Sequence, residues 1–159
     1  MSDIFKVRRA QLEDKDTLLN VWRALYEWHH LHCEEMIKPP CINELDAELD
    51  SYLSTLDCFI FVLEVEEHIV GFITGQLCQL QSPLLKSQMV GSIDHWFVND
   101  SYRQIGGGIA LLSRLETEFL NYGAMRVNAE VWGFNESALG VYRKHGFQTH
   151  IHCMTKTIV

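Results

Sequence analysis

The chain has 159 residues, of which 47% are hydrophobic and 21% are charged, and its net charge is −8. This composition predicts a single globular domain over residues 1–159 and excludes a disordered chain. An acidic charge without a basic stripe excludes nucleic acid as a main partner, and the chain lacks the apolar run of a membrane span or signal peptide. Five cysteines, an odd number without paired spacing, indicate free thiols in a reducing, cytoplasmic compartment.

Apolar spacing and turn residues predict helices and strands along the whole chain. In chain order they are a strand at 5–10, a helix from 14–16 onward, a helix at 43–54, strands at 58–65, 69–79 and 89–98, a helix at 108–122, a strand at 125–131, a helix after 135 and a strand at 150–157. Antiparallel strands come first and a strand–helix–strand unit follows. This order predicts an α/β domain with a mixed sheet.

Two of the predicted helices carry apolar residues at helical spacing, and these residues mark the faces expected to pack on the sheet. In the first helix the apolar positions are Leu18, Trp22, Leu25 and Trp28 or His29. In the helix at 108–122 they are Ile109, Leu112, Leu115, Phe119 and Tyr122.

A glycine-rich turn joins the strand at 89–98 to the helix at 108–122. It contains Gly106, Gly107 and Gly108. The first backbone N–H groups of a helix have no intrahelical partner and lie at the positive end of its dipole, so such a turn favours a phosphate group. Glycine also allows a ligand to approach the backbone closely. No lysine follows, which excludes a P-loop, and Leu111 replaces the third glycine of a dinucleotide fingerprint.

A second motif runs from Asn135 to Phe147. Asn135 is a candidate helix N-cap, Gly146 suits the position after the helix end, and Tyr142 lies two turns beyond the cap. Together with Arg103-x-x-Gly106-x-Gly108, this Asn-x-x-Ala-x-x-x-Tyr-x-x-x-Gly-Phe segment resembles the motifs of the GNAT superfamily of acetyl-CoA-dependent N-acetyltransferases. Both motifs stand in the family's order, separated by a helix and a strand, and the element order is similar over essentially the whole chain.

The resemblance implies a GNAT-like, mostly antiparallel mixed sheet with helices on both faces and a splayed strand pair that holds the cofactor. It implies acetyl-CoA as the cosubstrate and a homodimer as the assembly. The diphosphate would lie on the glycine turn with Arg103 pairing bidentately, and the pantetheine arm would bind the exposed strand edge. The implied cofactor-binding residues are Phe97, Val98, Arg103, Gln104, Ile105, Gly106, Gly107, Gly108, Ile109, Ala110 and Asn135.

Acetyl transfer to an amine needs a base for the ammonium proton and benefits from an acid for the departing thiolate. Tyr142 matches the family tyrosine near the cofactor sulfur, and its phenol can donate a proton while staying neutral. Asp94 is the candidate base, because it lies inside an apolar strand where some GNAT enzymes, including polyamine acetyltransferases, carry a glutamate. His95 is the alternative. Because adjacent strand residues point to opposite faces, we expect only one of the two to face the substrate.

The expected reaction moves the acetyl group from acetyl-CoA to a primary amine by direct attack in a ternary complex. The acidic charge and Asp94 favour a small-molecule acceptor (a polyamine, diamine or amino sugar), with Trp28, Glu34 and Glu35 as candidate contacts. Acetylation of a protein amine, a non-catalytic acyl-CoA-binding sensor or scaffold, and a nucleotide-binding protein are the alternatives. His29 and Cys33 lie four residues apart, but no recognised spacing completes a zinc site, so we expect no metal.

Overall fold

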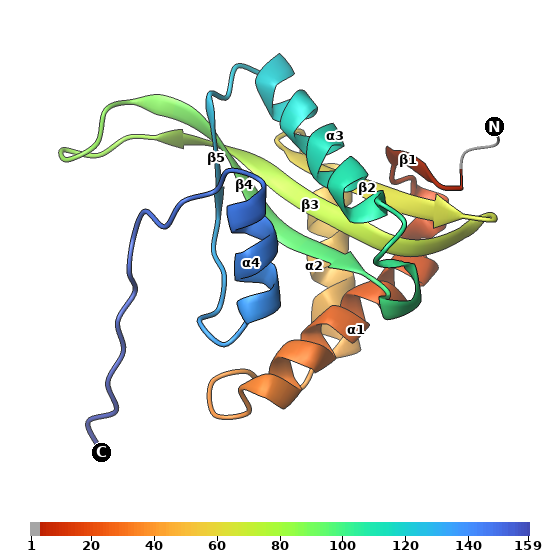
Figure 1. Ribbon diagram of the computed structural model, residues 1–159, viewed down its shortest axis with the longest axis horizontal. Coiled ribbons are helices and arrows are strands. Elements are labelled where there is room, and N and C mark those ends of the chain that lie inside the picture. The colour runs from red at the N-terminus through yellow and green to blue at the C-terminus, as the bar shows by residue number, and fades with distance from the viewer. Residues whose placement is uncertain (1–3) are drawn as a thin grey trace.

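One mixed sheet forms the centre of the computed structural model, which describes residues 4–159 (Figure 1). The strand order is β1-β2-β3-β4-β5, and every pairing is antiparallel except the parallel pairing of β4 with β5. The predicted mixed, mostly antiparallel sheet is therefore confirmed. The strands are β1 (Lys6–Arg9), β2 (Cys58–Val65), β3 (His68–Leu80), β4 (Gln88–Val98) and β5 (Arg126–Ala129).

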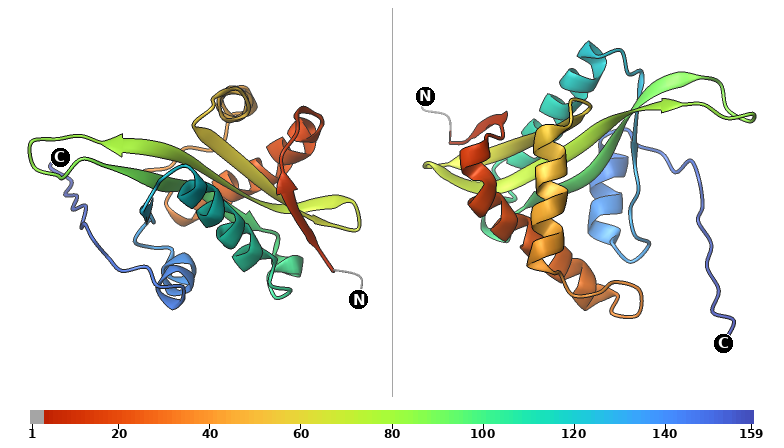
Figure 2. Two further views of the ribbon diagram at one scale, coloured as in Figure 1. Left: turned by 90° about the horizontal axis from the view of Figure 1, so that it is seen from above. Right: turned by 180° about the vertical axis from the view of Figure 1, so that it is seen from behind.

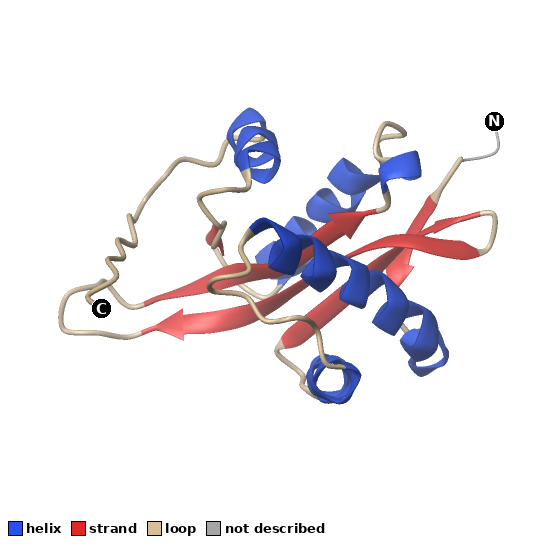
Figure 3. Ribbon diagram, turned by 90° about the horizontal axis from the view of Figure 1, so that it is seen from below, coloured by secondary structure: helices blue, strands red, loops and turns tan. Residues whose placement is uncertain are grey.

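Helices cover both faces of the sheet, with α1 and α2 on one face and α3 and α4 on the other (Figure 2, Figure 3). They are α1 (Lys15–His32), α2 (Ile42–Ser54), α3 (Gly107–Asn121) and α4 (Glu136–Lys144), with the short 3-10 turns η1 (Leu12–Asp14) and η2 (Asp100–Tyr102). Within residues 4–159, no helix has the length and apolar content needed to cross a bilayer.

The alternation of side chains along β2 divides the core into two layers. Phe59, Phe61 and Leu63 are buried against α3, whereas Ile60 and Val62 are buried against α1 and α2. Because β2 is apolar on both faces, the sheet is packed between two helical layers.

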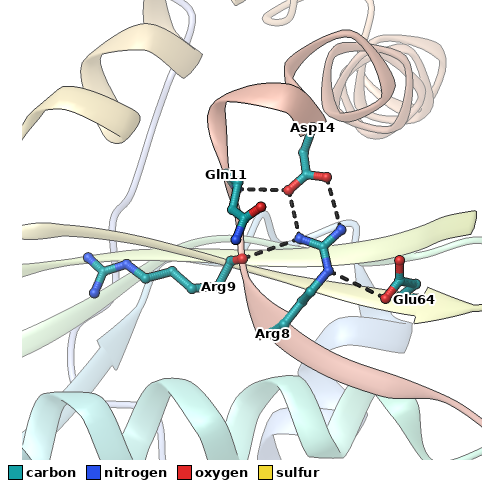
Figure 4. A network of polar contacts seen from close by, with 5 residues as sticks. All are labelled: Arg8, Arg9, Gln11, Asp14 and Glu64. Carbon is teal, nitrogen blue, oxygen red and sulfur yellow. Dashed lines mark hydrogen bonds and ion pairs between the residues drawn. The ribbon is translucent and has the colours of Figure 1, made fainter. Parts of the chain in front are cut away.

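An arginine network holds β1 to the start of α1 (Figure 4). The guanidinium of Arg8 donates to both carboxylate oxygens of Asp14, at 2.7 and 2.9 Å, and its Nε lies 3.4 Å from Glu64 of β2. Asp14 also accepts from the backbone N–H of Gln11 at 2.7 Å. This bidentate pair orients α1 as the chain leaves the sheet.

The sheet opens between β4 and β5. Their pairing runs from Val90 with Arg126 to Ile93 with Ala129 and then stops. Because β4 continues to Val98 while β5 ends, the second half of β4 has one unpaired edge. In Figure 1, β5 runs at an angle to the end of β4. The splayed strand pair implied by the family resemblance is therefore present.

The predicted strand at 150–157 is wrong. Residues 148–159 form no strand, and every one of them is exposed. This segment, called here the C-terminal arm, leads away from the sheet after α4 (Figure 1). Its β-branched residues have the propensity of a strand, but a strand forms only where a neighbouring edge accepts its hydrogen bonds.

The predicted apolar face of the helix at 108–122 is partly wrong. Leu111, Leu112, Leu115 and Phe119 are buried, but Ile109 is 38% and Tyr122 is 55% exposed. The helix ends at Asn121, so Tyr122 already belongs to the turn around Gly123, whose φ is +91°. Leu111, which the sequence pattern left out, lies one turn before Leu115 and therefore faces the sheet.

Candidate functional site

The glycine turn places free amides at the start of α3. Gly106 is the N-cap with a left-handed φ of +87°, a conformation that glycine adopts without steric cost. Ala110 makes the first intrahelical bond, donating its N–H to the carbonyl of Gly106 at 3.2 Å. The N–H groups before Ala110 therefore have no helical partner and are directed out of the helix end. Such an arrangement suits a diphosphate.

The three glycines of this turn differ in what surrounds them. A Cβ at Gly107 would collide with the side chain of Leu63, so packing on β2 requires glycine there. A Cβ at Gly108 would lie 3.6 Å from Val98, an ordinary van der Waals distance, and one at Gly106 would meet open space. The protein's own packing thus does not require glycine at Gly108. This observation fits a backbone that a ligand approaches closely.

The hydrogen-bond ladder decides which residues present peptide groups at the open edge of β4. Asn99 donates its N–H to Val70 of β3 at 2.8 Å. Since bonded and non-bonded pairs alternate in an antiparallel ladder, Phe97 also turns its peptide groups toward β3, and Trp96 and Val98 turn theirs to the open edge. The peptide groups of Phe97 therefore do not face the open edge, and those of Trp96 do so beside Val98. The contact of these residues with the cofactor stays a prediction.

Arg103 is engaged by the protein itself. Its Nε donates to the carbonyl of Val98 at 2.8 Å, its Nη1 lies 3.0 Å from Asp100, and its guanidinium lies over the ring of Phe97. These contacts brace the turn between β4 and α3. A bidentate pairing of Arg103 with a phosphate requires it to leave some of these partners. Gln104 is exposed and Ile105 half-buried in the same turn.

Tyr142 lies beside the glycine turn, on the face of the sheet that α3 covers. Its ring packs edge to face on Trp96, with centroids 5.2 Å apart, and on Phe147 at 4.9 Å. Burial raises the pKa of the Tyr142 phenol above its ordinary value, so the hydroxyl stays protonated. The predicted cap is confirmed, because the side-chain oxygen of Asn135 accepts from the N–H of Ala138 at 3.1 Å and starts α4.

A β-bulge in β4 turns Asp94 and His95 toward the same face. Thr74 of β3 pairs with His95, but the next residue, Gly75, pairs with Ile93, so Asp94 is an extra residue in the ladder. Both side chains bond to residues of the α1 and α2 layer. The predicted alternation of these two residues is therefore wrong, because a bulge shifts the alternation by one residue. That only one of the two faces the substrate stays a prediction.

Three side chains hold the carboxylate of Asp94. The hydroxyl of Tyr52 and the amide of Gln76 donate to Oδ2, the latter at 3.0 Å, and the hydroxyl of Ser92 donates to Oδ1 at 2.8 Å. Burial and this bond to Asp94 raise the pKa of Tyr52, which keeps it a donor. A carboxylate offers about four lone-pair positions, so one on Oδ1 stays open to a water or an amine.

His95, by contrast, uses both ring nitrogens inside the protein. Its Nδ1 lies 2.6 Å from the Thr74 hydroxyl, and its Nε2 lies 2.7 Å from the Tyr26 hydroxyl and 3.0 Å from Glu48. Burial opposes ionisation of Glu48, but hydrogen bonds from His95 and Tyr26 outweigh it and lower its pKa. His95 is thus a linker between helices and sheet, and Asp94 is the carboxylate with an open position.

Several residues of this site carried no signal in the sequence. Tyr52, Gln76 and Ser92 come from α2, β3 and β4, and Tyr52 stands 42 residues from Asp94 along the chain. A tyrosine and a glutamine in apolar elements look like ordinary packing and surface residues. Only the alternation of Ser92 and Asp94 along one strand could have linked any two of them.

The histidines near the end of α1 bond to the backbone. The Nδ1 atoms of His29, His30 and His32 lie 2.9, 2.6 and 2.7 Å from the carbonyl oxygens of Leu25, Ile37 and Trp28. In the part of the chain that the structure describes, no group of three or more His, Cys, Asp or Glu residues is placed to hold a metal ion.

Comparisons with known proteins agree with this geometry. The model of the acetyltransferase (GNAT) family matches residues 22–147. An acetyltransferase of Yersinia pestis is 25% identical over 144 residues, covering 91% of this chain and 88% of that protein. A single-residue mutant of the BH1408 protein from Bacillus halodurans has a TM-score of 0.88 at 16% identity, covering 97% of this chain and 99% of the other.

The aminoglycoside N-acetyltransferase AAC(6')-Iy, solved in complex with CoA, has a TM-score of 0.80 at 15% identity, covering 96% of this chain and 93% of the other. These two solved structures share the fold, and the family model covers most of the chain, including both sequence motifs. The chain therefore belongs to the acetyltransferase (GNAT) family, and the protein is an acetyl-CoA-dependent N-acetyltransferase.

Proposed function

We propose that the protein acetylates the primary amine of a small molecule by direct attack in a ternary complex. The observation that carries this proposal is the unpaired edge of β4, which joins the glycine turn at one end to the bulge at Asp94 at the other. A ligand lying along this edge reaches both the free amides of α3 and the carboxylate. Trp96, between them, contacts Tyr142.

The cofactor is assigned to the edge and the turn together. The free amides at Gly107, Gly108 and Ile109 and the dipole of α3 would hold its diphosphate, with Gln104, Ile105, Gly106 and Ala110 shaping the turn. The peptide groups of Trp96 and the N–H of Val98, whose carbonyl accepts from Arg103, would pair with its pantetheine amides, and Asn135 would lie near the same arm. When bound, acetyl-CoA supplies the thioester that carries the acetyl group.

Asp94 is assigned the role of base. An alkylammonium with a pKa of about 10.4 is almost fully protonated at pH 7, and it has no lone pair for attack until a proton is removed. The open lone-pair position on Oδ1 accepts this proton directly or through one water. Tyr52 and Gln76 fix the other oxygen, so the carboxylate holds one orientation.

Tyr142 is assigned the role of acid. Its buried phenol stays protonated because burial raises its pKa, and no hydrogen bond within residues 4–159 contributes to that shift. The hydroxyl is therefore available to protonate the departing thiolate. The direct route needs no cysteine nucleophile. Burial raises the pKa of the thiols of Cys58 and Cys78, which makes them poor nucleophiles.

A small-molecule acceptor is supported by the net charge of −8, which attracts cations. It is also supported by AAC(6')-Iy, a protein of the same fold solved with a bisubstrate analogue of CoA and acetylneamine. The five free cysteines suit a reducing compartment, so we place the enzyme in the cytoplasm.

An amine panel tests this function. Polyamines, diamines, amino sugars and lysine peptides are incubated with acetyl-CoA, and release of the free thiol is followed together with the mass of the acetylated product. Turnover of small amines, with ternary-complex kinetics, supports the proposal. Turnover of peptides alone would assign a protein substrate, and CoA binding without turnover of any amine would assign a sensor.

We also infer a homodimer in which the C-terminal arm of one copy adds to the β5 edge of the other. The arm is exposed along its whole length and includes the exposed apolar residues Ile151, Met154 and Ile158. Among the described strands, β5 pairs only with β4, so its outer edge is free. A free edge and a strand-forming segment without a partner are complementary.

A further inference from the structure

Five aromatic rings meet between the end of α1 and the loop from β5 to α4. Phe134 of the loop lies 5.9 Å from Trp28, 6.0 Å from His29 and 6.0 Å from His32, measured between ring centroids. Trp132 stacks on Phe134 at 6.0 Å, and Trp28 stacks on His32 at 4.1 Å. We call this set the aromatic collar. Its rings are half-buried or exposed, so it is not a closed core cluster.

The aromatic collar lies next to the open part of the sheet. Trp132 follows the end of β5 at Ala129, and Phe134 precedes the cap of α4, Asn135. On the other side, Tyr26 of α1 bonds to His95 of β4, and His29 comes three residues later on the same helix. The end of α1 and this loop lie on the same side of the molecule in both Figure 1 and Figure 2. The collar therefore bounds one end of the split between β4 and β5.

Acidic residues dominate the two segments that carry the aromatic collar, with Arg23 and Lys38 flanking the first segment and Arg143 following the second. Residues 24–37 contain Glu27, Glu34 and Glu35, and residues 128–142 contain Glu130 and Glu136. Neither of these two segments contains a lysine or an arginine. The segments that carry the collar thus favour a cation and disfavour an anion.

The two histidines of the aromatic collar contact backbone carbonyl groups through Nδ1. Nδ1 of His29 and Nδ1 of His32 lie next to carbonyl oxygens, which only accept hydrogen bonds. A hydrogen on Nδ1 satisfies these contacts, and in that tautomer Nε2 is an acceptor. Aromatic faces attract alkylammonium groups, and an imidazole Nε2 accepts their N–H bonds.

We propose that the aromatic collar binds a second cationic nitrogen of the acceptor, so that the preferred substrate is an aliphatic diamine or polyamine. The inference rests on the proposed function, because it concerns the same acceptor. One ammonium would lie in the collar while the other amine faces Asp94. A monoamine of the same length would lack the second positive charge that the aromatic faces attract.

The test compares the wild-type chain with Phe134→Leu and Trp132→Leu on α,ω-diamines and on alkyl monoamines of equal length. We expect kcat/KM for the diamines to exceed that for the monoamines, and each substitution to lower only the diamine value, by about 5- to 10-fold, as a cation–π contact of about 1 kcal/mol implies. The affinity for CoA stays unchanged. The control is Tyr122→Leu, an exposed aromatic residue at the far end of α3, with both values unchanged.

A second measurement does not depend on turnover. Hexamethonium has two quaternary ammonium groups on an aliphatic chain and has no N–H that could be acetylated. Calorimetry should show that it binds the wild-type chain and binds Phe134→Leu at least 5-fold more weakly. Such binding without turnover of any amine would overturn the proposed function but would support cation binding by the aromatic collar. Turnover with equal effects on diamines and monoamines, and no hexamethonium binding, would overturn the collar alone.

Discussion

Trp96 of β4 and Tyr142 of α4 pack edge to face, with ring centroids 5.2 Å apart. The indole Nε1 of Trp96 also donates to the carbonyl of Gly108 at 3.1 Å, in the first turn of α3. The side chain of Trp96 thus contacts both the glycine turn at the start of α3 and the proposed acid, Tyr142. Because the indole lies between them, side-chain packing sets the spacing between the glycine turn and the phenol.

Removal of the Tyr142 hydroxyl tests the acid. Tyr142→Phe keeps the packing on Trp96 and Phe147, so we expect unchanged thermal stability and unchanged affinity for CoA. Without a proton donor for the thiolate, kcat should fall by about 100-fold, within the usual range for general acid catalysis. Steady-state kinetics and calorimetry measure the two effects. An unchanged kcat would remove Tyr142 from the mechanism.

Asp94 and His95 can be separated by their amide variants. Asp94→Asn keeps the shape of the side chain but loses the charge, and we expect a fall in kcat of about 100-fold or more with the fold retained. His95→Gln breaks contacts to Thr74, Tyr26 and Glu48, so it should lower the melting temperature more than kcat. If His95→Gln lost activity at full stability while Asp94→Asn stayed active, the roles assigned here would be reversed.

The glycine turn offers a matched pair of substitutions. A methyl at Gly108 meets Val98 at an ordinary distance of 3.6 Å, so Gly108→Ala should fold normally and weaken CoA binding by about 10-fold, or about 1.4 kcal/mol. A methyl at Gly107 collides with Leu63, so Gly107→Ala should lower the unfolding free energy by about 1–3 kcal/mol. Thermal melts with and without CoA distinguish the two. Normal CoA affinity in Gly108→Ala would place the diphosphate elsewhere.

Deletion of the C-terminal arm tests the homodimer. Light scattering on a size-exclusion column should give a dimer mass for the full chain and a monomer mass for residues 1–147. The arm contributes no buried residue to its own copy, so the truncated monomer should stay folded by circular dichroism. A full chain that runs as a monomer at all concentrations, or a truncated chain that remains a dimer, would contradict strand exchange at β5.

The shifted pKa values predict where stability depends on pH. Burial raises the pKa of Tyr26, Tyr52 and Tyr142. Their contribution to the free energy of unfolding is therefore present below about pH 10 and is lost as the pH rises further. Asp14, paired with Arg8, and Glu48 have lowered pKa values, so their contribution is lost as the pH falls below about 4.

The urea concentration at the unfolding midpoint, measured from pH 3 to pH 11, should therefore be constant near neutral pH. It should fall toward acid pH and toward alkaline pH, which gives an acid limb and an alkaline limb. Tyr142→Phe removes one of the buried phenols and should make the alkaline limb shallower, while leaving the acid limb unchanged. A wild-type midpoint that stays constant up to pH 11 would contradict the burial of these phenols.

Local signals in the sequence determined much of the fold and the family. The glycine turn and the Asn135 cap each depend on a few neighbouring residues, and the structure confirms them. Glycine at a left-handed φ and a side chain that bonds an amide three residues later are properties of short segments. The candidates Asp94 and Tyr142 were also identified at this level, by residue type and position within a motif.

The tertiary structure alone decided how these residues are arranged. The bulge that turns Asp94 and His95 to one face and the orientation of Phe97 toward β3 both depend on the register between β3 and β4. The exposed C-terminal arm and the aromatic collar also depend on contacts between segments that are distant in the sequence. Whether a strand finds an edge, or a ring finds Phe134, depends on packing between distant segments, and local propensity carries no information about such contacts.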